Sequence, residues 1–185
     1  MSASAGAPAS RPRLATVWLD GCSGCHMSFL DLDERLVEVA QGFDLVFSPF
    51  IDVKEFPHGV DVTLVEGAVG TEHNLAMIRT VRERSRIVVS FGDCAVNGNV
   101  PSYRNLFPVD AVLARSFAEN VDLEPRLPGA GVPALLPRVR PVHLVVPVDI
   151  FLPGCPPPAD VIYRLLTGVL AGETPDLTQI TRFGR

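Results

Sequence analysis

Short apolar runs rich in Val, Ile and Leu alternate along the chain with segments of helical periodicity, and this alternation constrains the fold more than any other feature. The runs that predict strands are 14–19, 43–48, 60–66, 86–92 and 148–154. The segments that predict helices are 27–40, 73–84 and 158–171. Nearly continuous apolar strands that alternate with helices are typical of a parallel sheet covered on both faces. The sequence therefore predicts an α/β fold with a doubly wound parallel sheet.

Two local features refine this prediction. In the first predicted helix, Ser28 and Asp31 fit the spacing of a capping box. The segment 97–147 does not fit the alternation, because it has only a weak helical signal at 109–119 and then six prolines between Pro125 and Pro147. We expect an ordered, Pro-rich excursion that wraps a partner or a site, and a loose surface loop is the alternative.

The length and composition indicate one soluble domain. The 185 residues fit a single core over 14–185, and the small, polar segment 1–13 predicts a disordered tail. Hydrophobic residues make up 47% and the mean hydropathy is +0.26, yet no apolar stretch is long enough to span a membrane. A deeply buried sheet or a large protein partner would account for the apolar surplus.

The charge and the N-terminal sequence narrow the function classes. A net charge of −5 without a basic stripe argues against nucleic-acid binding. The start of the chain has neither an apolar signal-peptide core nor a twin-arginine pair, so we expect a cytoplasmic protein. In a reducing compartment, four cysteines are not expected to form disulfides.

All four cysteines follow predicted strands. Cys22 and Cys25 come after the first strand, Cys94 after the fourth and Cys155 after the fifth. Because ligands of parallel α/β sheets bind outside the carboxyl ends of the strands, we expect the four thiols to share one edge. Four thiolates can hold zinc or an iron–sulfur cluster. The long spacing favours the cluster, while a zinc site and a redox-active C-x-x-C pair remain alternatives.

Four motifs resemble the small subunit of nickel–iron hydrogenases, especially the short form found in the cytoplasmic NAD-reducing type. They are VWLDGCSGCHMSFLDLDE, VEGAVG, GDCAVNGNVPSYRN and PGCPPPAD, and the resemblance extends from residue 14 to about 171. It implies a flavodoxin-like domain whose Cys22, Cys25, Cys94 and Cys155 bind one proximal 4Fe–4S cluster. It also implies a large subunit with the nickel–iron centre, and diaphorase-module subunits that carry further clusters and FMN and reduce NAD.

Two comparisons within the resemblance refine the type. No cysteine follows Cys155, whereas longer small subunits carry two more clusters in a C-terminal extension, so we expect the soluble form. The related quinone-reductase subunit has adjacent cysteines in its first motif. Here Gly21 precedes Cys22 and Ser23 follows it, which favours a hydrogenase.

The resemblance also directs attention to two carboxylates and a flavin. Glu66, after the third strand, is expected beside the cluster, where it would tune proton or redox behaviour. Glu55, after the second strand, is a candidate alternative oxygen ligand of an oxidised cluster. FMN in this chain is disfavoured, because Cys22 and Cys25 occupy the loop where flavodoxin-like sheets seat the phosphate. We expect His26 to be a polar residue at a helix start, and a donor to a sulfur of the site is the alternative.

Overall fold

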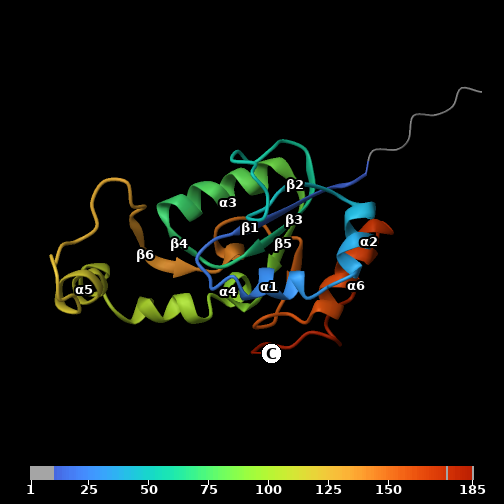
Figure 1. Ribbon diagram of the computed structural model, residues 1–185. Coiled ribbons are helices and arrows are strands. Elements are labelled where there is room, and N and C mark those ends of the chain that lie inside the picture. The colour runs from blue at the N-terminus through green and yellow to red at the C-terminus, as the bar shows by residue number, and fades with distance from the viewer. Residues whose placement is uncertain (1–10, 174, 185) are drawn as a thin grey trace, which may run out of the picture.

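Five parallel strands form the centre of the computed structural model, which describes residues 11–173 and 175–184 (Figure 1). The strands are β1 (Arg13–Trp18), β2 (Asp44–Phe47), β3 (Val60–Glu66), β5 (Ser85–Phe91) and β7 (Ile150–Leu152). Their order across the sheet is β2-β1-β3-β5-β7, and every neighbouring pair is parallel. Numbered by their position in the chain, these strands follow the 2-1-3-4-5 order of flavodoxin-like sheets. The predicted fold class is confirmed.

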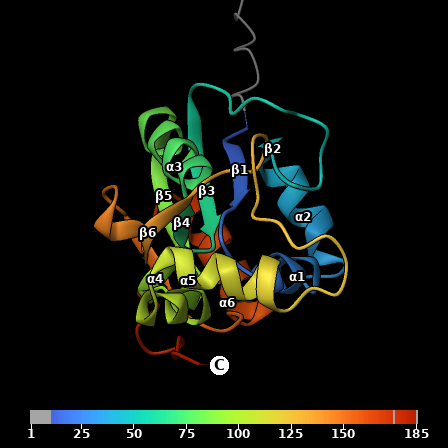
Figure 2. The same ribbon diagram turned by 90° about the vertical axis from the view of Figure 1, so that its left-hand side faces the viewer.

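Helices cover both faces of this sheet (Figures 1 and 2). One face packs against α1 (Gly24–Leu30), α2 (Arg35–Gly42) and α6 (Ala159–Leu170), and the other against α3 (Glu72–Arg84) and α4 (Asp93–Asn97). Successive strand residues point to opposite faces, so Leu14 belongs to the first core and Ala15 to the second. This two-sided burial explains the nearly continuous apolar strands.

The helix expected at 27–40 is two helices, and the predicted capping box is wrong. Residue Asp33 adopts a positive φ of 51° between α1 and α2. Helix α1 starts earlier, after Ser23, so Ser28 lies inside it rather than at its start. The Ser28 hydroxyl donates a hydrogen bond of 2.6 Å to the carbonyl of Pro157, a tertiary contact that local spacing does not reveal.

The Pro-rich excursion is substantially ordered. Its elements are the 3₁₀ helix η1 (Val100–Leu106), α5 (Val109–Ala114), the π-helical turn η2 (Arg115–Glu119), β6 (Leu135–Arg140) and the 3₁₀ turn η3 (Val142–Leu144). Strand β6 pairs antiparallel with β4 (Val69–Thr71), and neither strand was expected. Arg104 donates to the carbonyls of Leu136 and Gly70 at 3.0 and 2.7 Å. These bonds fasten the excursion to the carboxyl-end side of the sheet, where Figure 2 shows α5 facing the viewer.

The first described strand begins close to the N-terminal segment. Most of the tail predicted at 1–13 lies outside the described residues, and β1 already begins at Arg13. Within the described part of the chain, no helix combines the length and the apolar character that a membrane span requires.

Candidate metal centre

The four cysteines lie just beyond the carboxyl ends of β1, β5 and β7, as the sequence predicts. Cys25 is buried in the first turn of α1, and Cys94 is half-buried in α4. Cys22 and Cys155 are exposed, and all four thiols are free. The charges of Cys22, Cys94 and Cys155 each act on Cys25, so the structure brings the four sulfurs into one site.

A glycine between β5 and α4 makes room for the most buried thiol. Gly92 has a φ of 84°, which L side chains rarely adopt, and its amide donates to the carbonyl of Leu152 at 2.8 Å. A Cβ atom at this position would lie 2.1 Å from Cys25 Sγ. The backbone can therefore approach this sulfur only because residue 92 has no side chain.

Asp93 locks the cysteine loops together. One carboxylate oxygen accepts from the amide of Gly154 at 2.7 Å and the other from the amide of Gly184 at 2.6 Å. The Asp93 amide in turn donates to the carbonyl of Gly154 at 2.9 Å. Asp93 therefore fixes the loop that carries Cys155 relative to Cys94, a role that the sequence reasoning missed.

Two hydrogen bonds reach the exposed sulfurs. The amide of Gly24 lies 3.4 Å from Cys22 Sγ, and Asn99 Nδ2 lies 3.4 Å from Cys155 Sγ. Donors that point at sulfur stabilise its anionic form. Arg104 and Asn105, from the same motif as Cys94, bond backbone groups of the β4–β6 region.

The electrostatics of the site favour a cationic group. Burial raises the pKa of the Cys25 thiol far above its usual range, and the charge of Glu66 raises it further. Burial also raises the pKa of Cys94 to about 11, with added contributions from Cys22 and Cys155. Thiolate ligands in such a place need positive charge to offset their repulsion, and a metal group bound through soft sulfur supplies it.

The donor set of the site is four sulfurs. Among the described residues, no three His, Cys, Asp or Glu side chains converge as ligands for a single metal ion. A cluster several ångströms across requires ligands that surround it, whereas the ligands of a single ion converge on one position. The four thiols, the space left by Gly92 and the donors at Cys22 and Cys155 therefore fit a sulfur-bound cluster.

The two predicted carboxylates have different environments. Glu66 is only 1% exposed, at the end of β3, and its charge acts on both Cys25 and Cys94. Glu55 is exposed and lines a separate pocket with Phe56 and His73. It is not among the charges that act on Cys25 or Cys94, and its role as an alternative ligand stays a prediction.

His26 lies in the first turn of α1, as expected for a polar residue at a helix start, and it is buried. It is 2% exposed, and its backbone amide donates to Glu66 Oε2 at 3.0 Å. Its Nδ1 also contacts Glu66 Oε2. Only the adjacency of His26 to Cys25 could have drawn attention to it, because its partner lies 40 residues away.

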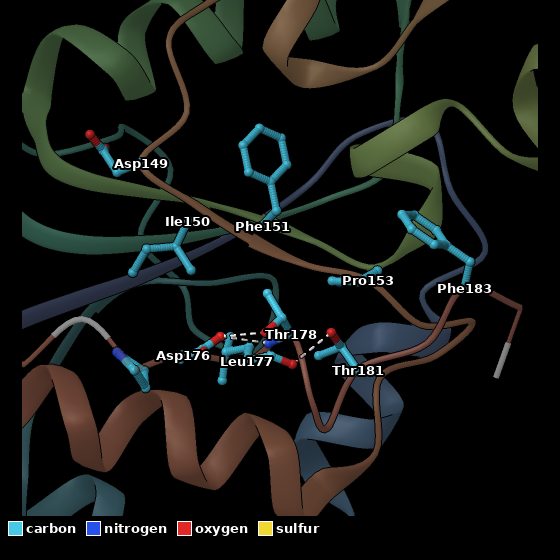
Figure 3. Close-up of a pocket in the computed structure, with 10 residues that line it drawn as sticks. Asp149, Ile150, Phe151, Pro153, Asp176, Leu177, Thr178, Thr181 and Phe183 are labelled. Carbon is cyan, nitrogen blue, oxygen red and sulfur yellow. Dashed lines mark hydrogen bonds between the residues drawn. The ribbon is translucent and has the colours of Figure 1, made fainter.

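A pocket of about 460 Å³ lies along the edge strand β7 (Figure 3). No cysteine lines it, and its walls include Ile150, Phe151 and Leu177. Its polar groups bond one another, since Thr178 donates to Asp176 at 2.7 Å and Thr181 to the Leu177 carbonyl at 2.8 Å. This pocket offers few free polar groups, so the thiol edge remains the candidate functional site.

The sheet is flavodoxin-like, and four cysteine thiols lie at its carboxyl edge. Together these features define an α/β domain of the kind found in subunits of oxidoreductases. The chain belongs to the family described as NADH ubiquinone oxidoreductase, 20 kDa subunit, whose model matches residues 22–169.

The chain is similar to several hydrogenase subunits. The chain is 37% identical to the NAD-reducing hydrogenase HoxS subunit delta of Cupriavidus necator, with 92% of this chain and 85% of that protein covered. It is 37% identical to a subunit of the F420-non-reducing hydrogenase of Methanocaldococcus jannaschii, over 89% of this chain and 58% of that protein. The chain spans 56–58% of the length of three such relatives from methanogens.

A solved structure agrees in fold over nearly the whole chain. A chain of the NAD⁺-reducing [NiFe]-hydrogenase in the H2-reduced state is 40% identical, with a TM-score of 0.89 and coverage of 94% of this chain and 99% of that chain. A chain of the [NiFeSe]-hydrogenase of Dm. baculatum, at 18% identity and a TM-score of 0.59, covers 88% of this chain and 63% of that chain and shares the fold alone.

Proposed function

We propose that this chain is the electron-transfer small subunit of a cytoplasmic, NAD-reducing nickel–iron hydrogenase. In this role Cys22, Cys25, Cys94 and Cys155 hold one 4Fe–4S cluster. The observation that carries the proposal is the gathering of four free thiols from three separate strand ends at one sheet edge. When bound, the cluster supplies reversible one-electron storage between the nickel–iron centre and the diaphorase module.

Residues around the cysteines hold the four thiols in position in the folded chain. Gly92 leaves room for the Cys25 sulfur, and Asp93 ties the Cys155 loop to α4. The Asn99 amide and the Gly24 N–H donate to sulfurs, which favours their thiolate form. The partly exposed position of the thiols keeps the transfer distance to a docked partner short.

The proposed partner is the large subunit that carries the nickel–iron centre. Large apolar side chains are exposed on the excursion: Val100, Tyr103, Leu106, Phe107 and Leu123. Apolar surface of this kind is typical of a protein interface. The near-complete coverage of the subunits from the two NAD-reducing hydrogenases supports the NAD-reducing type and a diaphorase module as the further partner.

The test uses the complex purified without oxygen from cells that express all its subunits. Iron, sulfide, nickel and zinc are quantified in the parent complex and in the Cys94→Ser variant, together with visible absorption and electron paramagnetic resonance (EPR). We expect the variant to lose the iron and sulfide of one 4Fe–4S cluster and to retain the nickel. A colourless site that contains zinc in the parent would instead support the structural-zinc alternative.

A further inference from the structure

Four polar side chains form a continuous buried chain behind the thiol site. They are Glu66, His26, Thr16 and Ser48, and none is more than 3% exposed. His26 Nδ1 contacts Glu66 Oε2, His26 Nε2 lies 3.0 Å from Thr16 Oγ1, and Thr16 Oγ1 lies 2.8 Å from Ser48 Oγ. Burying polar groups costs free energy unless they are paired, so a fully paired chain inside an apolar sheet indicates a specific role.

The two ends of the chain fix the direction of its hydrogen bonds. At one end the amide of Phe50 donates to Ser48 Oγ at 3.3 Å, and at the other the Glu66 carboxylate can only accept. Every hydrogen finds an acceptor when Ser48 donates to Thr16, Thr16 donates to His26 Nε2, and His26 Nδ1–H donates to Glu66. All donors then point towards the carboxylate, and such aligned bonds polarise one another.

The imidazole ring of His26 has little freedom to leave this arrangement. The ring of Phe50 packs edge-on against it at 5.6 Å between centroids, and the ring of Phe91 at 6.2 Å. The backbone amide of His26 also donates to Glu66 Oε2, at 3.0 Å. One residue therefore supplies two contacts to the same carboxylate oxygen.

The second carboxylate oxygen faces the cysteine loop. Both His26 donors reach Oε2, whereas Oε1 lies 3.6 Å from the position of a Cβ atom on Gly21, the residue before Cys22. The charge of Glu66 acts on both Cys25 and Cys94. A fixed carboxylate beside the cysteine loop imposes a constant negative potential on whatever the thiols hold.

We propose that His26, supported by Thr16 and Ser48, is a positioning residue that orients the Glu66 carboxylate against the thiol site and thereby sets the reduction potential of the group bound there. This inference rests on the proposed function. Loss of support would let the carboxylate rotate, and its effect on the cluster would weaken.

The test is an EPR-monitored redox titration of the intact complex. Glu66→Gln removes a negative charge and should raise the midpoint potential of the cluster. Thr16→Val keeps the shape and removes the hydroxyl, so it should raise the potential by a smaller amount, while Thr16→Ser should restore the parent value. When Thr16→Val is added to Glu66→Gln, the midpoint potential should not change by more than the variation between replicate titrations.

Thr63→Val is the matched control. Thr63 is also a buried threonine paired with a serine, at 2.7 Å to Ser85 Oγ, but it has no bond to the chain that ends at Glu66. We expect its complex to keep the parent potential. If Thr16→Val does not assemble, Ser48→Ala interrupts the same chain further from the site and should shift the potential in the same direction.

The outcomes separate this inference from the proposed function. An unchanged potential in Thr16→Val or Ser48→Ala, with full iron content, overturns the positioning role alone. An equal shift in the parent and Glu66→Gln backgrounds also overturns it, because the effect would not pass through Glu66. A parent complex without an iron–sulfur signal overturns the proposed function and the inference together.

Discussion

Replacement of Gly92 by alanine should empty the proposed cluster site, and the structure gives the size of the conflict. The new Cβ atom would lie 2.1 Å from Cys25 Sγ, and contacts of a Cβ below 3.0 Å are essentially never observed. The sulfur or the backbone must therefore shift by at least 0.9 Å, from 2.1 to 3.0 Å. Metal–ligand distances tolerate deviations of only about 0.2 Å, so Cys25 can no longer serve as a ligand.

The same substitution also strains the backbone, and a second glycine separates the two effects. A non-glycine residue in the left-handed α region costs about 1–2 kcal/mol. The backbone of Gly92, at φ 84° and ψ 163°, lies outside that region, in one essentially restricted to glycine, so its cost is at least as large. Gly172 has a φ of 76°, close to the 84° of Gly92, but no atom lies within 4 Å of its added Cβ. Gly172→Ala should therefore show the backbone cost alone, which lowers the melting temperature by about 2–8 °C in a domain of this size.

The assay compares iron and sulfide content, visible absorption and thermal melting of the two variants in the purified complex. We expect Gly172→Ala to keep the parent iron content and Gly92→Ala to lose the iron of one cluster. A Gly92→Ala complex with the full complement of iron and the parent EPR spectrum would refute the reasoning, because Cys25 would then not be a ligand.

Three further predictions follow from the site and its surface. Cys22→Ser and Cys155→Ser should abolish hydrogen-dependent NAD reduction but leave NADH oxidation by an artificial acceptor intact. If both activities continue at the parent rate, the electron-transfer role is wrong. In the metal-free chain, the Cys94 thiol keeps its proton in the fold up to a pKa of about 11, against an ordinary value of 9.0. Its contribution to stability is therefore fully present below pH 9.0 and lost as the pH rises to about 11. The melting temperature should fall across that range by more in the parent chain than in Cys94→Ser, because the buried Cys25 is present in both, and an equal fall would show that Cys94 is solvated. Expressed without its partners, the chain should aggregate or bind a hydrophobic dye through the exposed side chains at Tyr103, Leu106 and Phe107, whereas a monodisperse monomer that binds no dye would argue against an obligate interface.

The sequence predicted those features of the fold that depend on local patterns. The run 60–66 matches β3, and the other predicted strands lie within a few residues of β1, β2, β5 and β7. Because all five strands are parallel, the position of each cysteine after a strand was enough to place the thiols at one edge.

The features that escaped prediction depend on pairs of residues far apart in the sequence. Strands β4 and β6 pair Val69 with Arg140. Strand β4 has only three residues, and Pro137 and two arginines interrupt the apolar pattern of β6. The His26–Glu66 contact spans 40 residues, and Asp93 bonds Gly154 across 61. A single polar residue carries no signal of its partner, so only the folded chain reveals these contacts.

The placement of the thiols on the first and last strands of the sheet has a consequence for biosynthesis. The Cys22–Cys25 pair leaves the ribosome long before Cys155, which follows Cys22 by 133 residues. At about 5–20 residues per second, this separation amounts to about 7–27 s of translation. During that interval the nascent chain presents a bare C-x-x-C with no β7 to complete the site. On the proposed function, delivery of the cluster is therefore a late event in the life of the chain, and the early thiols would need protection from oxygen and stray metals until β7 docks.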